Sequence, residues 1–119
     1  MIVHLQKAYE YGKYETTNFK QYTKKYADGT LEYEAVIYKD GLNFVGSPIG
    51  KTCTINNLLT FPIQFIDNPI VTASVNNGQS TVYRIERTVR SISSLILWSL
   101  SEETDTEATI SIKAFGKWK

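Results

Sequence analysis

Two prolines bracket the aromatic segment LTFPIQFIDNP of residues 59–69, and this segment restricts the possible fold more than any other. Each proline lacks a backbone donor, fixes its own φ and biases the residue before it toward extended geometry. The segment is therefore neither a regular helix nor a plain strand. We expect a kinked, extended corner in which Phe61, Phe65 and Ile66 fill a core before the apolar stretch from Ile70 to Val75 begins.

The stretch from Leu31 to Tyr38 alternates with the period of a strand. Leu31, Tyr33, Ala35 and Ile37 fall on one face, and the intervening glutamates fall on the other. This is the pattern of a half-buried antiparallel strand. The preceding Asp28-Gly29 is a tight-turn signal, so we expect a hairpin with residues 19–26.

Turn residues divide the rest of the chain into further short strands. We expect the strand that begins at Leu31 to end at Lys39-Asp40-Gly41 and to be followed by a loop over 42–50. Further strands are expected over 51–56, 70–75, 81–87, 93–100 and 108–115. We expect 81–87 to pair with 70–75 across Asn76-Asn77-Gly78, and 108–115 to pair with 93–100 across an acidic loop. The spacing predicts an all-β fold, an antiparallel β-sandwich of about seven to eight strands. It spans residues 19–119, preceded by an N-terminal arm or first strand over 1–18.

One predicted strand contains the run LILWSL, which is apolar on both faces. If Ile96, Trp98 and Leu100 face the core, Leu95 and Leu97 need another cover. A loop of the same chain is one possible cover and a partner subunit is the other. Because large exposed apolar patches usually mark interfaces, we predict an oligomer interface at Leu95 and Leu97. We expect Trp98 to lie in the core.

Composition and motifs give no support to an enzyme or a metalloprotein. The chain has 13 Lys and Arg against 12 Asp and Glu, which is not the footprint of a nucleic-acid binder, and no apolar run is long enough to span a bilayer. His4 is the single histidine, so no catalytic triad is predicted. The acidic run 102–107 lacks the glycine and spacing of a calcium loop. We predict no catalytic residues, no metal and no cofactor; an axial ion on three copies of His4 is the weaker alternative.

Three motifs carry a resemblance to a known family: KYADGTLEYEA at 25–35, the proline corner followed by an apolar strand, and AFGKWK at 114–119. In this order they resemble the C-terminal modules of bacteriophage tail fibres and related phage minor structural proteins. The resemblance covers most of residues 20–119. It implies a lectin-like tail-fibre tip, a homotrimer, and a virion component made in the cytoplasm of the bacterial host. We expect Trp118 to pack back onto the body as a lid.

Aromatic and forked polar side chains gather around one predicted turn. Sugars are recognised by aromatic faces and by polar groups that bond hydroxyls, and guanidinium groups suit such paired hydrogen bonds. The candidate ligand-binding residues are Asn76, Asn77, Gln79, Tyr83, Arg84 and Arg87. The alternative is that Tyr83 and Ile85 face the core while the arginines form surface ion pairs.

The resemblance and the candidate residues together predict a non-enzymatic adhesin. Its partners are a bacterial surface polysaccharide or other glycan, further copies of itself, and other tail or baseplate proteins. Prophage-derived particles such as contractile bacteriocins are equally compatible. The alternative is a purely structural module that trimerises or caps a fibre or baseplate and binds no receptor.

Overall fold

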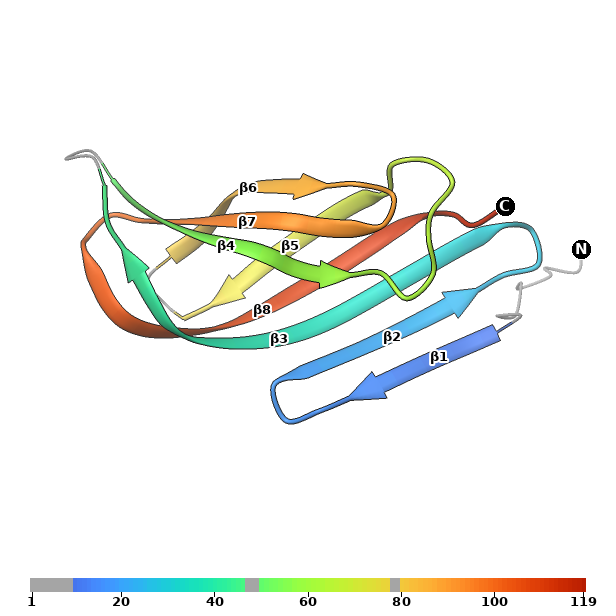
Figure 1. Ribbon diagram of the computed structural model, residues 1–119, viewed down its shortest axis with the longest axis horizontal. Coiled ribbons are helices and arrows are strands. Elements are labelled where there is room, and N and C mark those ends of the chain that lie inside the picture. Colours follow the sequence, from blue (N-terminus) through green and yellow to red (C-terminus); the bar gives the residue numbers. More distant parts are fainter. Residues whose placement is uncertain (1–9, 47–49, 78–79) are drawn as a thin grey trace, which may run out of the picture.

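A computed structural model describes residues 10–46, 50–77 and 80–119, and this part of the chain contains strands and turns (Figure 1). The strands are β1 (Glu10–Glu15), β2 (Phe19–Lys25), β3 (Thr30–Phe44), β4 (Lys51–Thr60), β5 (Ile70–Asn76), β6 (Ser80–Arg87), β7 (Ser91–Ser99) and β8 (Glu103–Lys117). Within the described residues, no helix meets the length and apolarity that a membrane crossing requires.

The strands form two antiparallel sheets. The large sheet has the order β1-β2-β3-β8-β5 and the small sheet has the order β4-β7-β6. The small sheet lies over β3, β8 and β5, and the core fills the space between them (Figure 1). The predicted antiparallel β-sandwich is therefore confirmed.

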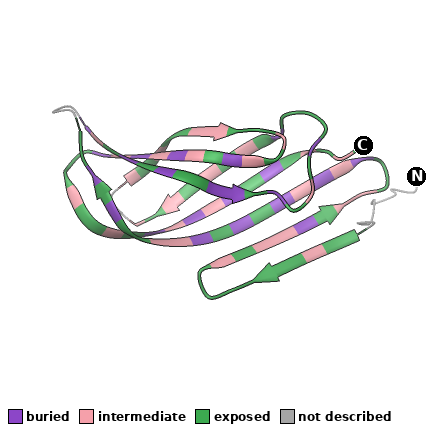
Figure 2. Ribbon diagram, viewed as in Figure 1, coloured by how far each residue is buried: buried purple, intermediate pink, exposed green. Residues whose placement is uncertain are grey.

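Strand β3 shows how the sequence pattern produces the core. Leu31, Tyr33, Ala35 and Ile37 are all buried, while the residues between them are more exposed, as the banding in Figure 2 shows. The predicted hairpin with β2 is also confirmed, since Phe19 to Lys25 pairs with Ile37 to Leu31. Gly29 takes a φ of 100°, which glycine adopts without a steric penalty.

The predicted end of this strand at Lys39-Asp40-Gly41 is wrong. Strand β3 continues to Phe44 through an irregularity in its pairing with β8, between Lys39 and Leu42. Gly41 adopts a φ of 63° there, so the glycine makes a bulge and not a turn. Leu42 and Phe44 are buried beyond it, and their burial explains why the strand continues into the expected loop.

Two predicted strand pairings are also wrong. Strand β5 pairs with β8 in the large sheet, whereas β6 pairs with β7 in the small sheet. Strands β7 and β8 likewise lie in different sheets, and Glu103 already belongs to β8. Both turns carry the chain from one sheet to the other. Local turn residues do not distinguish such a crossing from a hairpin, because the chain reverses direction in both cases.

The predicted oligomer interface at Leu95 and Leu97 is corrected by the fold. Both side chains are 0% exposed and lie inside the sandwich core of a single chain, so neither is available to a partner. The opposite face of β7 carries Ile96 and Trp98, which are half-buried on the outside of the small sheet, and Leu100 is exposed. The expected core position of Trp98 is therefore also wrong.

The predicted burial of the two phenylalanine rings in the proline corner is confirmed. Phe61 and Phe65 are buried and meet edge to face, with 5.1 Å between their ring centroids. The Phe65 N–H donates to the Val89 carbonyl oxygen at 3.0 Å, which fixes the corner against the small-sheet side of the chain. Ile66 was expected in the core as well, but it is largely exposed. Its N–H donates to the Lys117 carbonyl oxygen instead.

The three motifs that carry the family resemblance meet at one end of the sandwich. A Cβ on Gly116 would lie 2.8 Å from Phe65 Cδ1, so the glycine makes room for the ring. Trp118 packs against the core, and its indole N–H donates to the Tyr26 carbonyl oxygen at 2.8 Å. The predicted lid is therefore confirmed. The Lys25 ammonium lies 4.1 Å from the centroid of the same ring, a cation–π contact.

Strands β1 and β2 project beyond the small sheet and form a wing (Figure 1). Five of the six β1 residues are exposed, whereas β2 is mostly half-buried (Figure 2). The inner face of the wing continues the buried face of β3, since Tyr14 pairs with Gln21 and Gln21 pairs with Ala35. Residues 1–9 lie outside the described part of the chain.

Candidate functional site

A polar hollow, here called the Tyr38 cup, lies on the outer face of the large sheet where β3, β5 and β8 come together. Its volume is about 220 Å³. The outer face is the one that points away from the small sheet, because the alternate residues of these strands form the core. The lining residues are Tyr38, Asn76, Asn77, Thr106, Glu107, Ala108 and Thr109.

Tyr38 and Glu107 form the centre of the cup. The Tyr38 hydroxyl donates to Glu107 Oε2 at 2.5 Å, across the pairing of β3 with β8. This hydrogen bond, together with desolvation, raises the pKa of Tyr38 above its ordinary value. Tyr38 therefore stays a neutral donor over the physiological range. The carboxylate keeps acceptor capacity on its oxygens for a ligand, since an ionised carboxylate offers about four lone-pair sites.

A second hollow extends the cup across the sheet toward the wing. It has a volume of about 180 Å³ and shares Tyr38 and Thr109 with the cup, so the two hollows are neighbours; together they are called the groove here. Its far end is the turn between β1 and β2. That turn is fixed by backbone bonds, since the Thr16 N–H donates to the Phe19 carbonyl oxygen and the Tyr38 N–H donates to the Asn18 carbonyl oxygen.

The groove has the chemistry of a hydroxyl-binding surface. An aromatic ring, a carboxylate, an exposed amide and threonine hydroxyls line it together. Among the described residues that line the cup, Glu107 supplies the single carboxylate. Glycoside hydrolysis ordinarily uses two carboxyl groups across the scissile bond. The cup therefore lacks this pair among its described lining residues, and its donors, acceptors and aromatic ring suit reversible binding of hydroxyl groups.

The structure separates the six predicted ligand-binding residues. Asn76 lies in the cup, and its side chain is exposed. Asn77 also lines the cup, but its Oδ1 accepts hydrogen bonds from the Ser80 N–H and the Ser80 hydroxyl, which closes the turn. Gln79 lies outside the described residues. Sequence reasoning thus found one side of the cup.

Tyr83, Arg84 and Arg87 lie on β6 in the other sheet. Tyr83 is 67% exposed beside an irregularity between Val82 and Arg84. Arg84 Nη2 lies 2.5 Å from Glu86 Oε1, an exposed ion pair of the kind that contributes little to stability. Arg87 Nε donates to the Pro69 carbonyl oxygen, so this side chain ties β6 to the proline corner. All three residues are exposed on β6.

Sequence reasoning missed Tyr38 and Glu107 as site residues. They are 69 positions apart, and only the pairing of β3 with β8 brings them together. One signal was present in the sequence: the strand alternation places the aromatic Tyr38 on the solvent face. Its partner could not be found without the strand order.

The described residues contain no group of three or more His, Cys, Asp or Glu side chains that could hold a metal ion. His4, considered as an axial ligand, lies outside the described residues.

Two solved structures are similar to this chain. The P. aeruginosa R1 pyocin fibre comprising C-terminal residues 323–701 matches with 16% identity and a TM-score of 0.52, over 92% of this chain and 28% of that one. An N-truncated R1-type pyocin tail fibre matches with 17% identity and a TM-score of 0.51, over 92% and 87% of the two chains. The fold is similar to that of a pyocin tail fibre.

The tail-fibre resemblance seen in the sequence is thereby confirmed at the level of the fold. The chain spans little more than a quarter of the first of these structures. No model of a known protein family matches the sequence, and no curated protein matches it.

Proposed function

We propose that this chain is the receptor-binding tip of a tail fibre, from a phage or a phage-tail-like particle, and that it adheres to a glycan on the bacterial surface. Both similar structures are tail fibres, and one of them comprises the C-terminal residues of its fibre. We also propose that the particle's other tail proteins hold the chain in place. Adhesion of this kind involves no covalent chemistry.

The Tyr38 cup is the observation that carries the proposal. Its carboxylate and amide provide acceptors and donors for sugar hydroxyls, and hydrogen bonds to a charged group contribute about 1.5–3 kcal/mol each. The half-buried Tyr38 ring offers an apolar surface beside these groups. One shallow site binds weakly, but several identical sites on one particle act together and raise the overall avidity.

Glu107→Gln should weaken glycan binding about tenfold or more, because it removes a charge-assisted acceptor worth at least one factor of ten in affinity. Asn76→Ala should act in the same direction. Both residues are exposed, so the melting temperature should stay close to that of the wild type. Binding is measured on a glycan array and on whole cells, with thermal unfolding as the check on folding.

Glu102→Gln is the matched control, since it makes the same chemical change at an exposed carboxylate outside the cup. It should bind as the wild type does. Tyr83→Ala tests the other candidate surface, on β6. Unchanged binding in Glu107→Gln and Asn76→Ala with loss in Tyr83→Ala would move the site to β6. Unchanged binding in all three variants would exclude both the Tyr38 cup and β6 as the glycan-binding site.

We further propose that the chain is a homotrimer, through a surface different from the one predicted. Ile70 and Phe115 are neighbours across β5 and β8, and they are 69% and 50% exposed on the outer face of the large sheet. They border a hollow of about 300 Å³ whose rim carries both signs of charge, from Glu32, Glu34 and Lys113. An apolar centre with a mixed polar rim is typical of protein interfaces.

Light scattering at micromolar concentration should give a mass about three times the 13.5 kDa of one chain. Phe115→Ser should shift the protein toward the monomer while leaving its fold intact, because the residue lies outside the core. A wild-type protein that stays monomeric at the highest concentration measured would contradict the trimer and leave the fold unaffected.

A further inference from the structure

A cleft lies on the opposite face of the large sheet from the Tyr38 cup, between the inner face of the wing and the proline corner. It has a volume of about 230 Å³ and is lined by Gly12, Lys13, Tyr14, Gln21, Thr23 and Pro62. We call it the wing cleft. Pockets for drug-sized ligands typically enclose about 300–1,000 Å³, so this cleft suits a ligand of about one ring.

The polar floor of the wing cleft depends on a glycine in β1. Gly12 pairs with Thr23, and a Cβ on Gly12 would lie 2.3 Å from the Thr23 hydroxyl oxygen. That hydroxyl therefore occupies the space that any other residue at position 12 would fill. A glycine in the middle of a strand weakens it, and such a glycine often marks a close approach. Here it places a hydroxyl group on the floor of the cleft.

Gln21 is the second polar residue on the floor of the wing cleft, and a hydrogen bond from the core holds its side chain. The buried Tyr33 hydroxyl donates to Gln21 Oε1 at 2.8 Å. Burial raises the pKa of Tyr33, so the hydroxyl keeps its proton and acts as the donor. The side-chain oxygen of Gln21 is thereby engaged with the core. Its amide NH₂ group carries two further donors, and Gln21 lines the cleft, so a bound ligand can accept a hydrogen bond from this residue.

The walls of the wing cleft are an aromatic ring and a proline ring. Tyr14 is 55% exposed, and its ring packs against Phe19 with 6.2 Å between centroids, which limits its motion. Pro62 lies across from it in the proline corner, whose position is fixed by the buried rings of Phe61 and Phe65. An aromatic face and a proline ring therefore border a floor of amide and hydroxyl groups.

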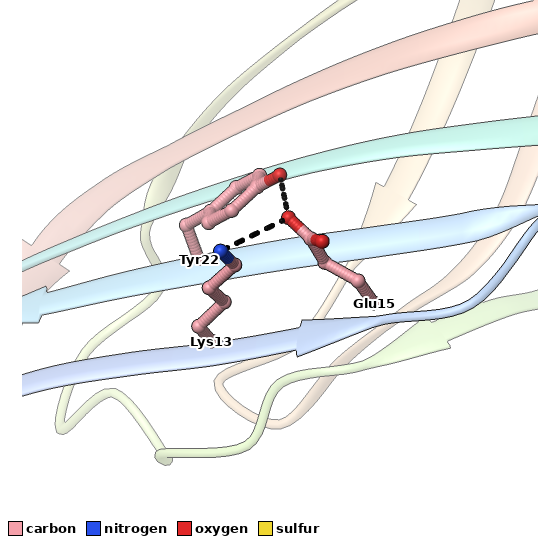
Figure 3. A network of polar contacts seen from close by, with 3 residues as sticks. All are labelled: Lys13, Glu15 and Tyr22. Carbon is pink, nitrogen blue, oxygen red and sulfur yellow. Dashed lines mark hydrogen bonds and ion pairs between the residues drawn. The ribbon is translucent and has the colours of Figure 1, made fainter.

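Lys13 is the one charged residue among the described residues that line the wing cleft. Lys13 contributes to the lining, but its side chain turns to the outer face of the wing (Figure 3). There Lys13 Nζ lies 3.6 Å from Glu15 Oε1, and the Tyr22 hydroxyl donates to the same oxygen at 2.6 Å. The ammonium of Lys13 is thus paired with a carboxylate on the outer face of the wing, whereas the inner-face residues that line the cleft are uncharged.

We propose that the wing cleft binds a neutral hexopyranose ring, one sugar unit of a longer glycan. The C–H face of such a ring fits against Tyr14 and Pro62, and its hydroxyls bond Gln21 and Thr23. The inner-face residues that line the cleft, Gly12, Tyr14, Gln21 and Thr23, are all uncharged, so a neutral sugar should bind better than an acidic one. This ligand class rests on the proposed adhesive function, whereas the cleft and its groups do not depend on it.

The test is a titration of the ¹⁵N-labelled protein with the methyl glycosides of glucose, galactose and mannose, followed by two-dimensional NMR. At least one of them should cause saturable shifts of the Gly12, Gln21 and Thr23 signals. Methyl glucuronide, the acidic analogue, should bind at least tenfold more weakly. Gln21→Glu should also weaken the neutral sugar about tenfold, since it keeps the acceptor for Tyr33 and removes the amide donors. Tyr14→Ala should do the same by removing the aromatic wall.

Gln64→Glu is the matched control, because Gln64 is exposed and lies outside the cleft. It should bind as the wild type does. The inference is overturned if no neutral glycoside shifts these three signals, or if folded Gln21→Glu and Tyr14→Ala both bind like the wild type. Cell binding that depends on Glu107 without any wing-cleft shift would overturn this inference alone. Wing-cleft shifts in a protein that binds no cells would overturn the proposed function alone.

Discussion

Replacing Phe65 with alanine should lower the free energy of unfolding by about 3–5 kcal/mol. The Phe65 side chain is 0% exposed and packs edge to face on Phe61, while Gly116 leaves the space that the ring occupies. The substitution removes the ring and leaves a cavity at the point where the three sequence motifs meet. Urea unfolding followed by tryptophan fluorescence measures the change.

Ile66→Ala is the matched control for this substitution. It truncates the neighbouring residue in the same corner, but Ile66 is 55% exposed, so its loss should have a much smaller effect. If Phe65→Ala and Ile66→Ala proved equally mild, the corner would not be part of the core, and the packing described for the motifs would be wrong.

Leu97→Asp should prevent the chain from folding. Leu97 lies in β7, opposite Cys53 of β4, and its side chain is 0% exposed within one chain. An unpaired carboxylate placed there loses its water without gaining a partner, at a penalty of several kcal/mol, and a cavity is added. Because domains of this size are stable by about 5–15 kcal/mol, the variant should show no cooperative thermal transition.

Ser93→Asp places the same charge at an exposed position of the same strand, where its pairing with β6 is irregular, and it should fold normally. The pair of variants also separates the present account from the interface first predicted for Leu95 and Leu97. A Leu97→Asp protein that kept its native fold and merely dissociated would show that this side chain belongs to an interface between subunits after all.

The parts of the fold that the sequence predicts are those decided by neighbours along the chain. The alternation in β3, the Asp28-Gly29 hairpin and the burial of Phe61 and Phe65 all follow from local patterns and from backbone geometry. The bulge at Gly41 was mistaken for a turn because the same residue serves both purposes. Whether Gly41 forms a turn or a bulge depends on whether Leu42 and Phe44 are buried in the core, which the local sequence does not specify.

The sheet crossings and the orientation of β7 could not be predicted in this way. A strand that is apolar on both faces gives no preference for Leu95 and Leu97 over Ile96 and Trp98. The small sheet decides the choice, because Leu95 and Leu97 pair with Ile55 and Cys53 on the core side. Pairing of strands that are distant in sequence is therefore the missing information.

The same limit applies to the candidate site. The predicted group was chosen from one stretch of sequence, and the structure divides it between two sheets. The Tyr38 cup combines residues from β3, β5 and β8, and the wing cleft combines β1 and β2 with the proline corner. Asn76 was found because it ends a strand beside the cup. Gln21 and Tyr14 could not be identified as ligand-binding residues from the sequence. Their role depends on the hydrogen bond from Tyr33 to Gln21 and on the position of Pro62 across the cleft from Tyr14.

Binding of the purified wild-type protein to bacterial cells tests the central claim most directly. The measurement uses a panel of strains with defined surface polysaccharides, each paired with a mutant that lacks its polysaccharide. We predict saturable binding to at least one strain, competition by its purified polysaccharide, and loss of binding to the paired mutant. Binding that is equally strong with and without the polysaccharide, or no binding to any strain or arrayed glycan, would contradict the adhesive function and leave a structural cap of the fibre.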